Sequence, residues 1–154
     1  MQRLVFLYAL ISFPLLAMEP HCDLIAKNIG TIKKTEMDTC WKSCQSNDSC
    51  DGAVFISGWN RCFLKNEIKR KSSIKFFSEI KGKEASYDRD FTGKDLKKHV
   101  VDDVSKCRLK CDDEARCTGF TYIEGYRDCW IKHTAGRLIP KIFSCRVKEK
   151  KRKG

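Results

Sequence analysis

CRLKCDDEARCTGFTYIEGYRDCWIK, residues 107–132, repeats the pattern of CWKSCQSNDSCDGAVFISGWNRCFLK, residues 40–65. Four cysteines keep the same spacing in both stretches, and each lies 67 residues after its counterpart (107 − 40 = 67, 129 − 62 = 67). A repeat of this length without a gap indicates a duplicated module. Beyond the fourth cysteine, the best match shifts by one residue and aligns 75–78 (KFFS) with 141–144 (KIFS).

Each copy predicts one short helix followed by a β-hairpin. Ranges 35–47 and 102–115 contain Thr or Asp residues that can cap helix amides, and two cysteines at i and i+4 in each range share one helix face. Segments rich in β-branched and aromatic residues follow, separated by Gly-containing turns: 53–57 and a segment from Cys62, then 120–123 and a segment from Cys129. We therefore expect an α+β fold class, with one helix crossing an antiparallel sheet in each copy.

The chain opens like a secretory signal peptide, which we assign to residues 1–18. An uncharged apolar run extends from Leu4 to Ala17, too short for a comfortable membrane span. It ends at a small residue where cleavage is expected, within one or two positions. No second apolar stretch of spanning length follows. We expect a secreted chain, or one in a secretory organelle, without a transmembrane anchor.

All ten cysteines follow this segment, which in an exported chain favours disulfides over free thiols. Zinc sites usually show Cys-x2-Cys pairs or clustered histidines, whereas this chain has longer cysteine spacings. Its histidines are His21, His99 and His133, and none recurs in both copies or lies beside an obvious nucleophile. We expect no metal, no cofactor and no enzymatic activity.

The formal net charge is +11, which favours polyanionic partners such as sulfated glycans and also aids solubility. The excess is concentrated in a central basic run and in a basic tail, assigned to residues 149–154. The tail resembles a nuclear signal, but the export signal argues against that interpretation and against nucleic acid as a partner. A solvated tail without a partner is the alternative. The candidate polyanion-binding residues are Lys69, Arg70, Lys71, Lys150, Lys151, Arg152 and Lys153.

The cysteine pattern resembles the PAN/apple domain family. The second copy carries the resemblance best, through Gly93-Lys94-Asp95-Leu96, Val104-Ser105-Lys106-Cys107, Cys117-Thr118-Gly119-Phe120-Thr121-Tyr122 and Cys129-Trp130-Ile131-Lys132. The first copy departs at Ala53, where the family favours an aromatic residue. We assign module one to residues 19–82 and module two to residues 86–148.

The resemblance implies a disulfide pairing that the spacing alone does not. In the family, the first helix cysteine joins the strand cysteine, and the second joins the cysteine just after the helix. The implied pairs are Cys40 with Cys62, Cys44 with Cys50, Cys107 with Cys129, and Cys111 with Cys117.

Cys22 and Cys145 remain. Apple domains often tie their first strand to their last, but here Glu79 stands at the expected partner position of Cys22, and Arg89 at that of Cys145. We expect that Cys22 pairs with Cys145 and clasps the two modules, through exchange of terminal strands. The alternative is that each is free or pairs between chains, which would give a covalent homodimer or oligomer.

The hairpin tips are the candidate ligand-binding residues. Aromatic faces beside hydrogen-bonding side chains suit sugar rings and peptides alike. The alternative is that the two tip aromatics fold back as packing. The candidate residues are Trp59, Asn60 and Arg61 in module one, and Tyr126, Arg127 and Asp128 in module two.

Modules of this family bind proteins or carbohydrates, and layouts similar to this one include galactose-binding lectins. We therefore expect a secreted adhesion or recognition protein whose partner is an extracellular glycan, glycoprotein or sulfated polysaccharide. A module that docks a receptor or protease, and a disulfide-linked matrix component, are the alternatives. Asn47-Asp48-Ser49 fits the N-glycosylation pattern, with Asp making it a poor acceptor.

Overall fold

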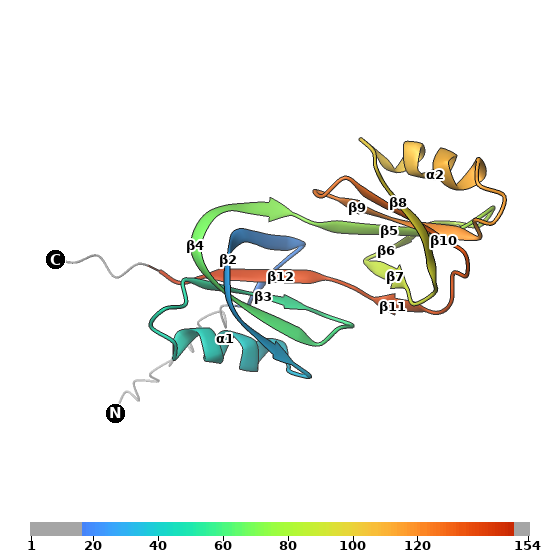
Figure 1. Cartoon of the computed structure of the whole chain (residues 1–154). Helices are drawn as coiled ribbons and strands as arrows, with labels where there is room; N and C mark the ends of the chain where they lie inside the picture. Colours follow the sequence, from blue (N-terminus) through green and yellow to red (C-terminus); the bar gives the residue numbers. More distant parts are fainter. Residues whose placement is uncertain (1–16, 150–154) are drawn as a thin grey trace, which may run out of the picture.

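The structure, a computed structural model, describes residues 17–149 and contains two five-stranded antiparallel sheets, each with one helix (Figure 1). The first sheet, in the order β1-β12-β3-β4-β2, consists of β1 (Glu19–Pro20), β12 (Phe143–Val147), β3 (Gly52–Ile56), β4 (Arg61–Ser73) and β2 (Cys22–Lys33). The second, in the order β6-β5-β9-β10-β8, consists of β6 (Ser86–Tyr87), β5 (Lys75–Ile80), β9 (Gly119–Glu124), β10 (Asp128–Lys132) and β8 (Asp95–Val100). A short pair joins β7 (Arg89–Phe91) to β11 (Leu138–Pro140). The predicted α+β layout is confirmed.

The two helices are shorter than the predicted ranges. Helix α1 (Met37–Gln45) packs on β3 and β4, and α2 (Val104–Asp112) packs on β9 and β10. Only α2 has a side-chain cap, because Asp103 accepts a hydrogen bond of 3.0 Å from the backbone N–H of Lys106, whereas Glu36 makes no such bond. The disulfides, rather than capping, are therefore the feature that both helices share.

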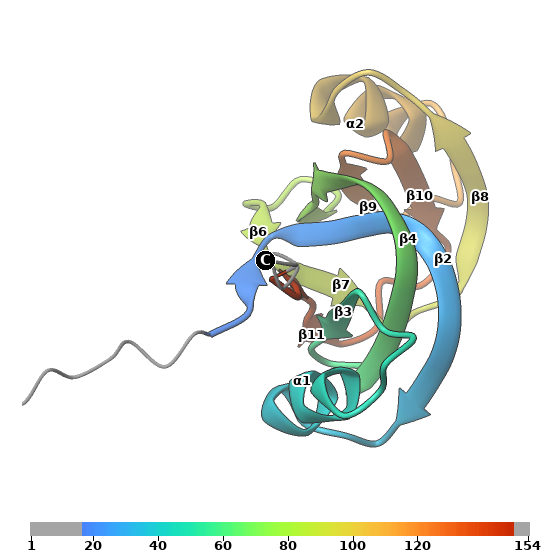
Figure 2. The ribbon, with the colours of Figure 1, turned by 90° about the vertical axis from the view of Figure 1, so that its left-hand side faces the viewer.

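The last strand of each copy joins the sheet of the other copy. β5 follows β4 of module one in the chain but pairs with β9 of module two. β12 follows module two but pairs with β3 of module one. Figure 1 shows these two strands crossing between the halves, and Figure 2 shows the paired strands β2 and β4 arching together over one side. The sheets therefore differ from the assigned modules, 19–82 and 86–148, by one exchanged strand each.

The exchanged strands correct the register expected from sequence similarity. Phe76 lies opposite Ile123, and Phe143 lies opposite Ile56 in the equivalent position. Since 143 − 76 = 67 and 123 − 56 = 67, the interval between the copies is unchanged and the one-residue shift is absent. The similarity of KFFS to KIFS gives the wrong alignment, because the strands they belong to occupy equivalent positions when matched by the residues with which they pair. Ser78, and not Glu79, is therefore the counterpart of Cys145.

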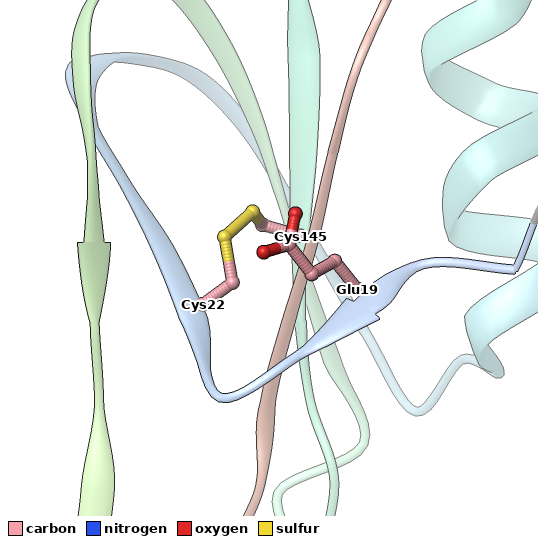
Figure 3. Close-up of side chains that lie close together, drawn as sticks. All are labelled: Glu19, Cys22 and Cys145. Atoms are coloured by element: carbon pink, nitrogen blue, oxygen red, sulfur yellow. A yellow bond between two sulfur atoms is a disulfide. The ribbon is translucent and has the colours of Figure 1, made fainter.

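All ten cysteines form disulfides within the chain, in the pairs that the resemblance implies plus Cys22–Cys145. The Cys22–Cys145 bond joins β2 of module one to the exchanged β12 (Figure 3). In the equivalent place on module two, Ser78 Oγ donates to the carbonyl oxygen of Arg89 at 2.8 Å. One half of the molecule thus has a covalent clasp where the other has a hydrogen bond.

Three buried clusters form the core, and the middle one belongs to both modules. One lies under α1 and one under α2, each around two disulfides. The middle cluster joins Leu24 and Val54 of module one to Phe143 and the clasp, with Tyr126 packed against it. Because each module completes the other's core, the two share one folding unit.

The expected signal peptide and basic tail fall almost wholly on residues 1–16 and 150–154, outside the described residues. At the boundary, Met18 is described, is only 6% exposed and packs in the cluster under α1. No helix in the described part of the chain is long and apolar enough to cross a membrane.

Candidate functional site

A pocket of about 270 Å³ lies between the modules, where the hairpin tip of module one meets the sheet of module two. Trp59 comes from the β3–β4 tip, and Trp130 comes from β10. Lys141 enters from the segment before the exchanged strand β12. The strand exchange therefore assembles the pocket from both copies.

The aromatic wall is partly open to solvent. Trp59 is 45% exposed, which is unusual for so large an apolar side chain. Lys141 Nζ lies 3.5 Å from the Trp59 ring centroid, and Lys98 Nζ lies 5.3 Å from that of Trp130. These cation–π contacts restrain both rings, so an approaching ligand would meet aromatic surfaces that are already positioned.

A buried charge cluster forms the polar part of the pocket. Asp90 Oδ2 accepts a hydrogen bond from Lys141 Nζ at 2.7 Å, while Lys132 Nζ lies 3.7 Å from Asp90 Oδ1 and 2.5 Å from Asp95 Oδ1. Thr121 Oγ1 donates to Asp90 Oδ1 at 2.9 Å. Both lysines are only 5% exposed. Each buried charge therefore has a partner of opposite sign.

The cluster shifts the pKa values of its members. Burial opposes ionisation of Asp90, but the hydrogen bond from Lys141 and the charges of Lys141 and Lys132 outweigh it and hold the Asp90 pKa below its usual range. Burial lowers the pKa of Lys141, against the opposing effect of Asp90. We therefore treat Asp90 as a carboxylate at neutral pH.

Module one has an equivalent pocket of about 150 Å³. Its lining includes Asp23, Asn28, Phe63 and Lys65, which lie 67 residues before Asp90, Asp95, Trp130 and Lys132. The two pockets are therefore counterparts, each formed by one sheet and the hairpin tip of the other module.

Tyr126 is the tip residue at the module-one pocket and lines both pockets. Its hydroxyl donates a short hydrogen bond to Asp23 Oδ2, and its ring meets Phe143 edge-on at 6.3 Å between centroids. Burial, and then the bond to Asp23, raise the pKa of Tyr126 strongly. Tyr126 is therefore anchored in the space between the modules.

Comparison with protein-family models agrees with this architecture. A model described as a PAN domain matches residues 20–88, and a second with the same description matches residues 89–132. The chain belongs to the PAN domain family. The comparison with curated proteins finds no match. PAN modules bind proteins and carbohydrates and are typically non-catalytic, so binding is the function class that the family supports.

The predicted tip residues of the two PAN modules separate into two groups. Trp59, Tyr126 and Asp128 line the pocket between the modules. Asn60, Arg61 and Arg127 do not line it; Arg61 lies over the Trp59 ring and Arg127 forms an ion pair with Asp102. The alternative that tip aromatics fold back as packing describes Tyr126 better than Trp59.

The sequence interpretation missed the pocket residues on the sheets of the PAN modules. Neither the cysteine pattern nor the choice of hairpin-tip residues as candidates identifies Asp90, Lys132 or Lys141 as pocket residues. A usable signal was present, because Asp23 and Lys65 recur as Asp90 and Lys132 at the repeat interval. A repeated lysine inside an apolar strand, together with a repeated aspartate, indicates a buried ion pair in each module.

A larger hollow, of about 550 Å³, lies at the chain ends of PAN module one. Trp41, Lys71 and Lys148 line it together with Ala17 and Glu149, which border the residues outside the described range. Because the chain on both sides of this hollow lies outside the described residues, the pocket between the modules is the better defined of the two. Lys69 and Arg70 are exposed on β4 near it in sequence, while Lys150, Lys151, Arg152 and Lys153 lie outside the described residues.

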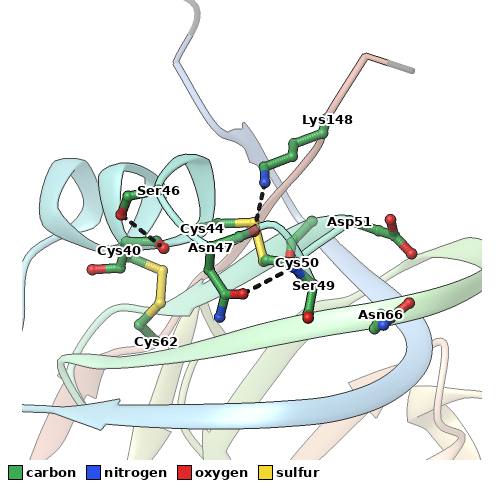
Figure 4. Close-up of a disulfide and its surroundings, with 12 residues drawn as sticks. Cys40, Cys44, Ser46, Asn47, Ser49, Cys50, Asp51, Cys62, Asn66 and Lys148 are labelled. Carbon is green, nitrogen blue, oxygen red and sulfur yellow. Dashed lines mark hydrogen bonds between the residues drawn. A yellow bond between two sulfur atoms is a disulfide. The ribbon is translucent and has the colours of Figure 1, made fainter. Parts of the chain in front are cut away.

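The loop after α1 is tied to this end of PAN module one (Figure 4). The Cys44–Cys50 bond closes it, and Lys148 Nζ donates to the Asn47 carbonyl oxygen at 2.8 Å. Asn47 Oδ1 accepts from the Ser49 N–H at 3.0 Å, so the glycosylation motif is held in a tight turn.

Glu19, Cys22 and Cys145 also lie within metal-binding distance of one another (Figure 3). Both sulfurs are consumed in the clasp disulfide, so they offer no thiolate to a metal ion. This group is therefore structural.

Proposed function

We propose that this chain is a secreted, non-catalytic adhesion or recognition protein that binds a neutral sugar unit of a glycan between its two PAN modules. The observation that carries the proposal is the pocket itself, in which Trp59 of one module and Trp130 of the other flank a buried cluster of aspartates and lysines.

The size of the pocket favours a single sugar unit. Its volume of about 270 Å³ is just below the range of about 300–1,000 Å³ that is typical of small-molecule sites. A peptide segment or a folded partner would need a longer groove or a broad surface. A sugar ring at the end of a glycan needs neither.

The composition of the lining suits the two faces of a sugar. Apolar C–H groups of a pyranose ring stack on aromatic surfaces, and Trp130 and the half-exposed Trp59 supply such surfaces in this lining. The hydroxyl groups both donate and accept hydrogen bonds. Asp95 and Asp128 can accept from them, and Lys132 can donate.

The charge of the pocket favours a neutral ligand. Three aspartates (Asp90, Asp95, Asp128) and two lysines (Lys132, Lys141) line it, and Lys98 pairs with Asp128 at 2.8 Å, so the formal charge is 3 − 3 = 0, although the whole chain carries +11. A sulfated chain would find no excess positive charge in this pocket and would be attracted to the basic surfaces elsewhere on the protein.

A sulfated polysaccharide is the second candidate ligand, at the chain ends of module one. There Lys71 of the central basic run and Lys148 next to the basic tail line one hollow. Two lysines far apart in sequence thus line the same hollow, although Lys71 is paired with Glu19 at 2.5 Å. An exposed pair of this kind contributes little and would exchange readily for a sulfate.

A glycan array read at low and at high salt separates these candidates. Binding of neutral glycans that resists salt supports the pocket, whereas binding of sulfated chains that falls steeply with salt supports the basic hollow, because ionic contacts are screened. If no glycan binds, the proposal is wrong and a protein partner becomes the better hypothesis.

Two variants assign the array signal to a surface. Trp130→Ala removes an aromatic wall of the pocket, and Lys71→Glu reverses a charge at the hollow. We expect Trp130→Ala to abolish neutral-glycan binding and leave sulfated-chain binding intact. Lys71→Glu should do the reverse.

A further inference from the structure

We propose that the chain carries one open sugar site and one closed counterpart, and that Tyr126 closes the second by occupying it as a built-in ligand. This inference rests on the proposed function, because it assigns the same chemistry to both pockets. It makes the protein monovalent for its sugar, although its two modules are alike in fold.

The two pockets share their polar and aromatic positions. Asp23 and Lys65 of module one stand where Asp90 and Lys132 stand in module two, and Phe63 stands where Trp130 does. The two aspartates differ in their partners: Lys141 and Thr121 donate to Asp90, whereas at the place of Thr121 module one has Val54, which cannot donate to Asp23. Asp23 is therefore the module-one carboxylate that can accept from a hydroxyl at its pocket.

The two hairpin tips differ in whether they carry a hydroxyl group that can bind the aspartate of the pocket. Tyr126 ends in a hydroxyl, which donates to Asp23 as a sugar hydroxyl would. Trp59, its counterpart 67 residues earlier, has no hydroxyl, and no hydrogen bond joins it to Asp90. The module-one aspartate is therefore satisfied by the protein's own tip, and its pocket is the smaller of the two.

A second difference keeps the module-two pocket open. Lys141 supplies the partner of Asp90, and at the equivalent position of module one stands Ile74, which is buried and cannot donate. Asp23 Oδ1 accepts from the Leu24 backbone N–H at 2.8 Å, so without Tyr126 it is Oδ2 that loses its hydrogen bond, with the charge of Lys65 near it. A ligand hydroxyl could then take the place of the Tyr126 hydroxyl.

NMR titration with a probe panel tests this inference. The probes are the methyl glycosides of galactose, glucose, mannose and N-acetylglucosamine, each added to saturation. The backbone amides of Asn28 and Phe63 report on the module-one pocket, and those of Asp95 and Trp130 on the module-two pocket. Tyr126→Leu removes the ring and the hydroxyl but keeps an apolar contact with Phe143, while Tyr126→Phe removes only the hydroxyl and protects the test against misfolding.

In the wild type we expect a probe to shift only the module-two reporters. Because Tyr126 also lines the module-two pocket, the module-one reporters alone test the closure: we expect them to shift in Tyr126→Leu, and to a smaller extent in Tyr126→Phe. Shifts in both pockets of the wild type overturn the closure. The inference is also overturned if neither variant gains the module-one shifts, whether or not the wild type binds. If the wild type shows no binding but a variant gains the module-one shifts, the proposed function of the open pocket fails while the closure stands.

Trp59→Leu is the matched control at the equivalent tip. This variant removes the aromatic ring at the equivalent hairpin tip from the open site, and it leaves the hydrogen bond between Tyr126 and Asp23 in place. We expect it to lose the module-two shifts without gaining any in module one. A gain in module one would mean that either tip variant simply loosens the interface, and would overturn the role given to Tyr126.

Discussion

Phe76 and Phe143, which stand in equivalent positions of the two modules, pack against each other with their ring centroids 5.8 Å apart. Equivalent residues touch only near the axis that relates two copies. His21 and Asp88, also 67 residues apart, are joined there by a hydrogen bond of 2.9 Å. The chain therefore resembles a symmetric dimer with exchanged strands, made within one polypeptide.

The clasp disulfide should stabilise the fold more than a local disulfide does. Cys22–Cys145 closes a loop over 123 residues, whereas Cys44–Cys50 spans only 6. The chain-entropy relation gives about 5 kcal/mol for the first and about 2 kcal/mol for the second. We expect paired Cys→Ser variants to lower the free energy of unfolding in that order, measured by urea denaturation. An equal or reversed order would argue against the clasp as a restraint on the whole chain.

Gly125 should tolerate no side chain, because the tip of module two lies against the end of β4 of module one. A Cβ at Gly125 would lie 2.0 Å from the Ser73 carbonyl oxygen, and φ there is +95°. Gly82 has a similar φ of +76° with nothing within 4 Å, so it isolates the cost of backbone strain. We expect Gly82→Ala to cost about 1 kcal/mol and Gly125→Ala more than about 3 kcal/mol in thermal or urea unfolding. Similar losses would mean that the two modules do not approach as described.

Asp90 should make the protein acid-labile. Its pKa in the folded state lies below the ordinary value of 3.8, so its stabilisation is present above that value and is lost as pH falls through the lower, folded pKa. We expect Asp90→Asn to lose about 3 kcal/mol at pH 7, because two buried lysines lose their common partner. Its remaining stability should vary less between pH 5 and pH 2 than that of the wild type, by urea denaturation. The exposed Glu84→Gln is the control and should follow the wild type.

Met18 should be the first residue of the mature protein. Its side chain is buried in the module-one core, although it is the last residue of the expected signal peptide, 1–18. Cleavage after Ala17 preserves this packing, whereas cleavage after Met18 removes it. The intact mass of the secreted protein distinguishes the two, and a chain that begins at Glu19 with unchanged thermal stability would contradict this prediction.

The cysteine spacing predicts much of each module, since an i, i+4 pair restricts where a helix can face. The exchange of terminal strands, β5 and β12, is predicted only from the two remaining cysteines, Cys22 and Cys145, and the structure confirms it. Either strand could join either sheet with the same alternation of apolar residues, and only the Cys22–Cys145 pair indicates the crossing.

The pocket is harder to predict for the same reason. Trp59, Trp130 and Lys141 meet only because the strands cross, so no single stretch of sequence contains the site. Among the tip residues, the sequence alone does not distinguish an anchored Tyr126 from a half-exposed Trp59. The difference arises because Tyr126 donates a hydrogen bond to Asp23, whereas Trp59 makes no equivalent hydrogen bond to Asp90.

The most direct test of the pocket as a sugar site compares Trp59→Ala with Trp41→Ala. Trp41 packs against Arg146 at the far end of module one and lies outside the pocket, so it is a matched aromatic control. We expect Trp59→Ala to weaken the affinity for the neutral glycan selected on the array by about tenfold or more, as loss of one stacking face implies. Trp41→Ala should bind like the wild type. Wild-type affinity in Trp59→Ala, or an equal loss in Trp41→Ala, would contradict the assignment of the site.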